Sequence, residues 1–194
     1  MKKPGGNITG VTDLTPIDKH MALVKRVVPT AKTVGVIFNP GEANSVTLVE
    51  LVKKYAPLEG MNVVEAGATK SSEVLSAARS LVGKADVIYV PTDNTVVSAF
   101  SAVIKVGHAA KLPVVAGDTD SVKQGAIAAL GFNYYDVGRQ TGKIVLQVLN
   151  DTKPGDIAVQ GVDKMELFVN PGAAKKMGIT LDASLIAEAK EVIK

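Results

Sequence analysis

Polar segments that could hold a charged ligand follow three short apolar runs of the sequence. These segments are residues 39–45, 91–95 and 117–121, and each carries at least one carboxylate. Glu42, Asp93 or Asp118 could bind a cation, while backbone N–H groups and serine or threonine hydroxyls could bind an anion. Both capacities at one place suit a zwitterion such as an amino acid.

The same residue types also have a purely structural explanation. Aspartate, asparagine and serine are ordinary helix caps and turn residues, and any loop of this kind carries them. Capping is the better explanation of each residue taken alone, whereas three such segments meeting at one edge make ligand binding an equal alternative. Both interpretations stay open at this point.

The elements that would position these segments alternate along the chain. Short runs rich in valine and isoleucine predict strands, and the stretches between them have the apolar spacing of helices. The predicted strands are residues 33–38, 61–66, 86–90, 113–116 and 126–132, with short edge strands at 157–159 and 167–170. The predicted helices are residues 15–28, 44–58, 71–82, 94–110, 118–124, 135–149, 171–176 and 182–194, the second of them capped by Asn44 or Ser45.

Repeated strand–helix–strand units predict an α/β fold of the flavodoxin-like kind, a mostly parallel sheet with helices on both faces. Ligands bind such sheets outside the carboxyl ends of the strands. The three polar segments follow three predicted strands directly. We therefore expect them to lie together at that edge.

Composition excludes several classes of protein. The chain has no cysteine, and its net charge of +3 is scattered rather than gathered in a basic stripe, so nucleic acid is not an expected partner. No apolar run approaches the roughly 20 residues of a membrane-spanning helix. No apolar stretch follows Lys2 and Lys3, so we expect no signal peptide and a chain that stays in the cytoplasm, where it is made.

No catalytic or cofactor motif is complete in this sequence. Residues 138–143 resemble the end of a phosphate-binding loop, but they are one residue short and Ile144 replaces the Ser or Thr that such a loop needs. His20 and His108 are each alone in a predicted helix, where a solvated or half-buried position is expected. We predict no enzyme activity, no catalytic residues, no cofactor and no metal site.

Several segments, taken in order, resemble one known family. They are residues 4–13, 34–37, 42–45, 90–95, 122–126 and 134–142. Together they resemble the substrate-binding proteins of ABC transporters, of the tryptophan/tyrosine type, over nearly the whole chain. The resemblance implies a type I periplasmic-binding-protein fold, in which two α/β lobes close over a small ligand and deliver it to an ABC permease.

The resemblance also implies a function and a site. The function would be non-catalytic binding of a small molecule, typically an aromatic amino acid, in an interlobe cleft, by a parent protein held in the periplasm or anchored outside the membrane by a lipid. The residues that would face the cleft are Glu42, Asn44, Ser45, Asp93, Asn94 and Asp118. The ligand's ammonium group would bind Asp118 or Glu42, and its carboxylate would bind Ser45, Asn94 and nearby N–H groups.

Members of this family normally begin with an export signal and a complete first lobe, and the resemblance of residues 4–13 to the hinge segment leads us to expect neither in this sequence. We therefore expect a second lobe with its return segment. Residues 1–14 would form the segment at the hinge, residues 15–133 the lobe, and residues 134–194 the return helix, short edge strands and C-terminal helix. Such a half-site would bind its ligand at millimolar concentration at best, or not at all.

In the family, the return helix packs on the first lobe. The apolar side of the helix that would do so here consists of Val137, Ile144, Val145 and Val148. We expect this side to drive formation of a homo-oligomer. The alternative function is an isolated scaffold fragment that self-associates as a swapped or paired dimer and binds no ligand. A regulatory effector lobe would need a DNA-binding headpiece, which the sequence does not contain.

Overall fold

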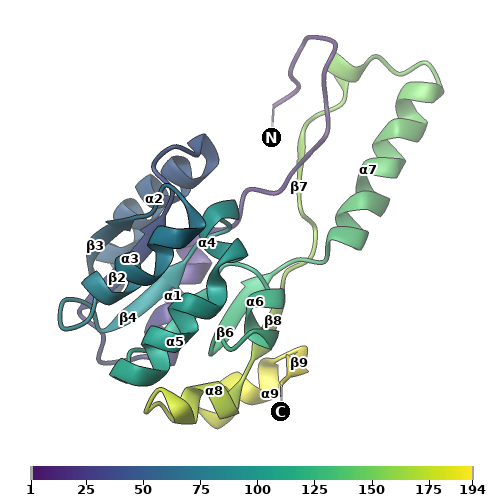
Figure 1. The fold of residues 1–194 in the computed structure, drawn as a ribbon. Helices are drawn as coiled ribbons and strands as arrows, with labels where there is room; N and C mark the ends of the chain where they lie inside the picture. The colour runs from purple at the N-terminus through teal and green to yellow at the C-terminus, as the bar shows by residue number, and fades with distance from the viewer. Residues whose placement is uncertain (1, 194) are drawn as a thin grey trace. The chain divides into compact units, whose positions relative to one another are not determined.

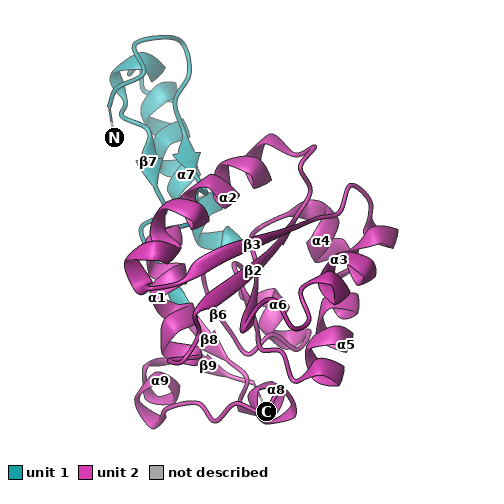
Figure 2. Cartoon of the chain, turned by 90° about the vertical axis from the view of Figure 1, so that its left-hand side faces the viewer, with its two compact units in different colours: residues 1–15, 132–166 teal, residues 16–131, 167–194 magenta. Residues whose placement is uncertain are grey.

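Two stretches far apart in the sequence make up each of the two units of this computed structural model (Figure 2). Unit 1 comprises residues 1–15 and 132–166, and unit 2 comprises residues 16–131 and 167–194. The structure describes residues 2–193. Met1 and Lys194, the outer ends of the first and last predicted segments, lie outside the described residues.

Unit 2 is built on a seven-stranded sheet (Figure 1). The strands, in their order across the sheet, are β3 (Asn62–Gly67), β2 (Thr33–Phe38), β4 (Val87–Val90), β5 (Val114–Ala116), β6 (Ala128–Gly131), β8 (Glu166–Val169) and β9 (Glu191–Val192). The pairs β2–β3, β2–β4, β4–β5, β5–β6 and β8–β9 are parallel. The predicted fold class, an α/β protein with a mostly parallel sheet, is confirmed.

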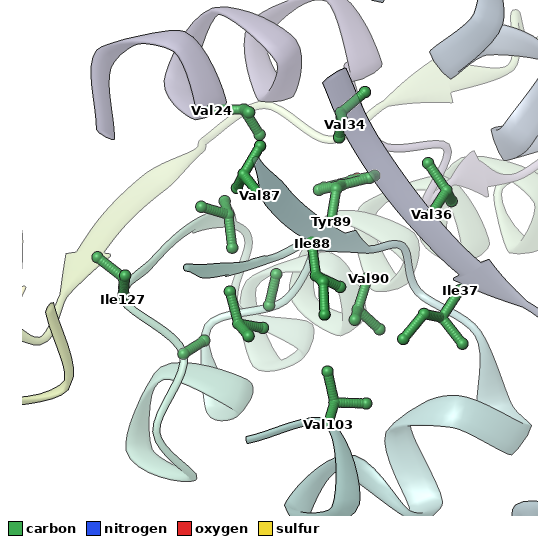
Figure 3. Packing of buried hydrophobic residues seen from close by; sticks show 14 of the residues in the cluster. Val24, Val34, Val36, Ile37, Val87, Ile88, Tyr89, Val90, Val103 and Ile127 are labelled. Carbon is green, nitrogen blue, oxygen red and sulfur yellow. The ribbon is translucent and has the colours of Figure 1, made fainter. Parts of the chain in front are cut away.

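The central strands are apolar on both sides because helices cover both faces of the sheet. Every residue of β4 is buried. Figure 3 shows the alternation: Val87 and Tyr89 lie on the side of Val24, whereas Ile88 and Val90 point to the side of Val103. Successive side chains of a strand point to opposite faces, so a strand buried on both sides needs an unbroken apolar run.

Helices of unit 2 pack on both faces of its sheet. They are α1 (Ile17–Val27), α2 (Ala43–Tyr55), α3 (Val74–Ser80), α4 (Asn94–Ser98), α5 (Phe100–Ala110), α6 (Asp120–Lys123), α8 (Pro171–Lys176) and α9 (Ala183–Glu188), with 3₁₀ turns η1 (Ala56–Glu59) and η2 (Ser71–Glu73). Helices α1 and α2 contact each other on one face, and α3 and α5 contact each other on the opposite face (Figure 2). The polar loops that follow β2, β4 and β5 are thereby attached to a sheet that helices cover on both faces.

Unit 1 consists of α7 (Tyr134–Leu149), the 3₁₀ turn η3 (Pro154–Asp156) and a two-stranded parallel pair of β1 (Val11–Thr12) and β7 (Gln160–Gly161). Gln140 connects the helix to the strand pair, because its side-chain amide donates to the carbonyl of Gly161 at 2.8 Å. Among the described residues of the chain, no helix has the length and apolar character needed to cross a membrane.

Several of the predicted elements differ in the structure. The helix predicted at 71–82 is the 3₁₀ turn η2 followed by the short helix α3, and β8, predicted as an edge strand, lies between β6 and β9 because the end of the chain adds β9 outside it. The helix predicted at 94–110 is two helices, α4 and α5, separated at Ala99. The strand predicted at 157–159 is wrong: pairing begins only at Gln160, opposite Val11, because the partner strand is two residues long. The last predicted helix ends at Glu188, and β9 follows it because the next N–H groups bond to the backbone of β8 instead of continuing the helix.

Candidate functional site

Three loops carry the predicted ligand-binding residues, and all of them lie in unit 2 at the carboxyl ends of parallel strands. They follow β2, β4 and β5. The loops after β4 and β5 adjoin, since the N–H of Gly117 donates to the carbonyl of Val90 at 2.8 Å. A Cβ at position 117 would lie 3.3 Å from the backbone nitrogen of Thr92, so glycine is what permits this close approach.

Asp93 connects the loop after β4 to the loop after β2. Its side chain is fully buried, and its two oxygens accept the N–H of Asn39 at 2.6 Å and the N–H of Val96 at 2.8 Å. The first bond joins the two loops, and the second caps the start of α4. A buried carboxylate needs such donors, so both oxygens are committed to the backbone.

Glu42 makes a second connection between the same two loops. One of its oxygens accepts the hydroxyl of Thr95 at 2.7 Å and the N–H of Thr95 at 3.2 Å. The other accepts the side-chain amide of Asn94 at 2.8 Å and the N–H of Asn94 at 3.3 Å. Burial acts to raise the pKa of Glu42, but these hydrogen bonds outweigh it and hold the pKa below its ordinary value. The carboxylate is therefore charged at neutral pH.

The start of α2 lacks the caps that the start of α4 has. Glu42 occupies the N-cap position of α2, but it makes no side-chain cap there, and the first turn contains no acidic residue. Among the described residues, the N–H groups of Ala43, Asn44 and Ser45 have no acceptor. The hydroxyl of Ser45, in the same turn, is fully buried and also has no partner. An uncapped helix N-terminus attracts negative charge.

Asp118 follows β5 and is half-buried. Its carboxylate accepts the N–H of Ser121 at 2.9 Å and the hydroxyl of Ser121 at 2.6 Å. A carboxylate has about four lone-pair positions, so two donors leave Asp118 with acceptor capacity to spare. Complete burial, with a further contribution from the negative charge of Asp118, holds the pKa of Tyr89 far above its ordinary value.

A buried polar pair lies under the same part of the sheet. The hydroxyl of Tyr89 and Nδ1 of His20 are 2.6 Å apart, and both side chains are almost completely inaccessible to solvent. Burial lowers the pKa of His20 to about 4, although the carbonyl of Leu130 and the charge of Asp18 act in the opposite direction. The prediction of a solvated or half-buried His20 is wrong, because α1 turns this residue toward β4.

The structure brings some of the six predicted residues into contact and leaves others apart. Glu42 and Asn94 are hydrogen-bonded, Asp93 directly precedes Asn94 in the chain, and Asn44 and Ser45 share the first turn of α2. Among the described residues, Asp118 accepts hydrogen bonds from Ser121 alone and from none of the other five.

Three polar residues of this edge were missed as functional candidates. They are Asn39, Thr95 and Ser121, and each is a hydrogen-bond partner of a predicted site residue. Asn39 stands directly after a predicted strand, a position that could have drawn attention to it. Within the described part of the chain, no cluster of histidine and acidic side chains could hold a metal ion.

Comparison with known sequences gives matches along nearly the entire chain. Residues 1–193 match the family described as ABC transporter substrate binding protein. A tyrosine-binding protein of Clostridioides difficile is 42% identical over 177 residues, which are 91% of this chain and 51% of that protein. The chain thus spans about half the length of the curated relatives that it matches.

Solved structures resemble this chain at comparable levels of identity. A conserved domain protein from Vibrio cholerae has a TM-score of 0.92 at 43% identity; the match covers 99% of this chain and 65% of that one. An ABC domain from Streptococcus pneumoniae, solved in complex with L-Trp, has a TM-score of 0.88 at 36% identity, covering 99% of this chain and 67% of the other.

Proposed function

Because this chain belongs to the family of ABC transporter substrate-binding proteins, we propose that it is one lobe of the extracytoplasmic solute-binding component of an ABC importer. Members of the family bind solutes without converting them, so the protein is not an enzyme. Its partners would be a small-molecule ligand and the permease of the transporter. The predicted division into a hinge segment, a lobe and a return segment at residues 14 and 133 belongs to this proposal.

The proposed ligand is an aromatic amino acid, bound in a cleft between this lobe and a second one. The main support for this ligand class is the 42% identity to a protein named for tyrosine binding. The complex of a second relative with L-Trp supports it further. Closure of two lobes normally buries most of a small ligand's surface. We therefore expect the isolated chain to bind weakly, at about millimolar concentration, which corresponds to roughly −4 kcal/mol.

The charges at the edge of the sheet support one orientation of the ligand. The start of α2 is uncapped and carries the unpartnered hydroxyl of Ser45, so it suits the α-carboxylate. Asp118 retains acceptor capacity and suits the ammonium group, whereas Glu42 already accepts five hydrogen bonds. Of the two predicted ammonium ligands, we therefore propose Asp118. Asp93 would support the loops without touching the ligand.

Titration of tryptophan tests this function directly. The chain contains no tryptophan, so the anisotropy of added tryptophan reports binding without background, and tyrosine can be measured by competition. The experiment compares the isolated chain with a longer protein in which a first lobe precedes this sequence, called the two-lobe form below. We expect saturable binding by the two-lobe form and weak binding by the isolated chain. Asp118→Asn should weaken binding about tenfold or more, since it removes a charge-assisted hydrogen bond to the ammonium group.

Asp120→Asn is the matched control for that substitution. It makes the same change of charge in the same loop, at a side chain that is 83% exposed. Its affinity for tryptophan should stay at the original value. Equal affinities of the two variants would contradict the assignment of Asp118, and absence of binding by the two-lobe form to both amino acids would contradict the proposed ligand class.

Self-association is a second candidate property of the isolated chain. Of the four residues predicted to form the unpartnered apolar side of this helix, only Val145 is exposed, because Ile144 is buried and Val137 and Val148 are half-buried. The apolar residues that α7 does expose include Val145, Leu146 and Leu149, at 49%, 60% and 72%. A contiguous apolar helix side of this kind favours association with another surface. Sedimentation velocity over a wide concentration range should show a dimer, and a monomer at every concentration would contradict this candidate.

A further inference from the structure

Glu42 stands at the start of one helix but caps another. Its backbone, at φ −99° and ψ 115°, has the extended conformation of an N-cap, and its carbonyl accepts the first bond of α2 from Val46. Its carboxylate instead turns to the first two residues of α4, Asn94 and Thr95, which lie more than fifty positions later in the chain. Asp93 takes the next N–H group of α4.

The result is an asymmetry between two neighbouring helix starts. At α4, two carboxylates occupy the first three N–H groups, so this terminus is closed to a further anion. At α2, the first three N–H groups have no acceptor within the described residues, and the buried hydroxyl of Ser45 has none either. Burying a hydroxyl without a hydrogen-bond partner costs free energy of folding. A polar group of a bound ligand would supply the partner that the hydroxyl of Ser45 lacks.

We propose that Glu42 is a positioning residue of the ligand site: it holds Asn94 and the start of α4 against the loop after β2, and it leaves the start of α2 free for the ligand's carboxylate. This inference rests on the proposed function. It also replaces the expectation that Glu42 binds the ammonium group. Glu42 acts through its neighbours, and Asp118 makes the ionic contact.

Hydrogen exchange without ligand tests the first half of this inference. In Glu42→Gln the amide NH₂ faces donors, so the bonds from Asn94 and Thr95 cannot all persist. We expect the backbone amides of Asn94 and Thr95 to exchange about tenfold faster, since each loses its acceptor. Glu50→Gln, the same change at an exposed position of α2, should leave both rates unchanged. Unchanged rates in Glu42→Gln would overturn the inference.

Ligand selectivity tests the second half, with a measurement that a general loss of stability would not change. Tryptophan and indole-3-propionate share the indole and the carboxylate, but only tryptophan has the ammonium group. In the two-lobe form, Glu42→Gln should weaken both ligands about tenfold and keep their ratio, because Asp118 still binds the ammonium group. Asp118→Asn should weaken tryptophan selectively and reduce the ratio. A ratio reduced equally by both variants would show direct contact by Glu42 and overturn the inference.

The two proposals fail in different ways. If the two-lobe form bound neither tyrosine nor tryptophan, the proposed ligand class would be wrong, while the exchange rates of Asn94 and Thr95 would still decide whether Glu42 holds the loops together. If tryptophan bound normally and Glu42→Gln changed neither the exchange rates nor the affinity, the proposed function would stand and the role of Glu42 would be wrong.

Discussion

Replacing His20 by glutamine should flatten the dependence of stability on pH. His20 is almost completely buried, and its contact with the hydroxyl of Tyr89 requires an acceptor or donor at Nδ1 but no charge. Burial disfavours the protonated form, so the pKa falls from 6.5 to about 4 in the folded protein. Glutamine can keep a hydrogen bond to Tyr89 but does not titrate.

The size of the effect follows from the two pKa values. Below pH 6.5 the unfolded chain binds a proton at His20 that the folded chain does not, so the free energy of unfolding decreases as the pH falls, and it stops decreasing below about pH 4. A pKa difference of this size corresponds to about 3 kcal/mol in total. Between pH 7.5 and pH 4.5 the contribution is about 2.5 kcal/mol.

Urea unfolding followed by circular dichroism measures this contribution. The free energy of unfolding of the original chain and of His20→Gln would be compared at intervals from pH 7.5 to pH 4.5. All other titrating groups, including His108, are common to both proteins, so the difference between the two curves isolates His20. We expect that difference to change by about 2.5 kcal/mol in favour of the variant as the pH falls. Parallel curves would refute the reasoning.

Two further substitutions test the packing and the loops of unit 2. Gly107→Ala should lower the free energy of unfolding by about 1–3 kcal/mol, measured by thermal unfolding, because the new Cβ would lie 2.8 Å from a methyl group of Val114. Asp86→Ala should cost about 1 kcal/mol in urea unfolding, because its carboxylate accepts the N–H groups of Lys32 and Thr33 at 2.8 and 2.9 Å. No change in either variant would contradict the contacts described.

The sheet and its carboxyl edge could be predicted because both depend on patterns local in the sequence. The run at residues 33–38 is apolar over a strand's length and ends at an Asn-Pro-Gly turn, and β2 has those bounds. Repetition of such runs between helical stretches fixes a parallel sheet, and a parallel sheet places the ends of its strands at one edge. The location of the candidate site follows from topology alone.

The hydrogen bonds within that edge could not be predicted, since local rules give the wrong partner. Capping preferences point to Asn44 or Ser45 at the start of α2. The structure places Glu42 there, and leaves the hydroxyl of Ser45 without a partner. Capping rules describe a side chain and the backbone within a few residues of it, as for Asp93 at the start of α4. Glu42, which accepts the first two N–H groups of α4, lies more than fifty residues earlier and is outside the reach of such rules.

The wrong prediction for His20 has the same cause, a hydrogen-bond partner that lies far away in the sequence. From the helix alone, a single histidine has no visible partner, because Tyr89 is sixty-nine positions away. Helix packing on the sheet creates this contact, just as the meeting of two loops creates the bonds of Glu42. Residue types therefore predict which groups are available at the edge of the sheet. Tertiary packing decides which of them form hydrogen bonds within the fold and which, like Asp118 and the start of α2, keep unused hydrogen-bonding capacity.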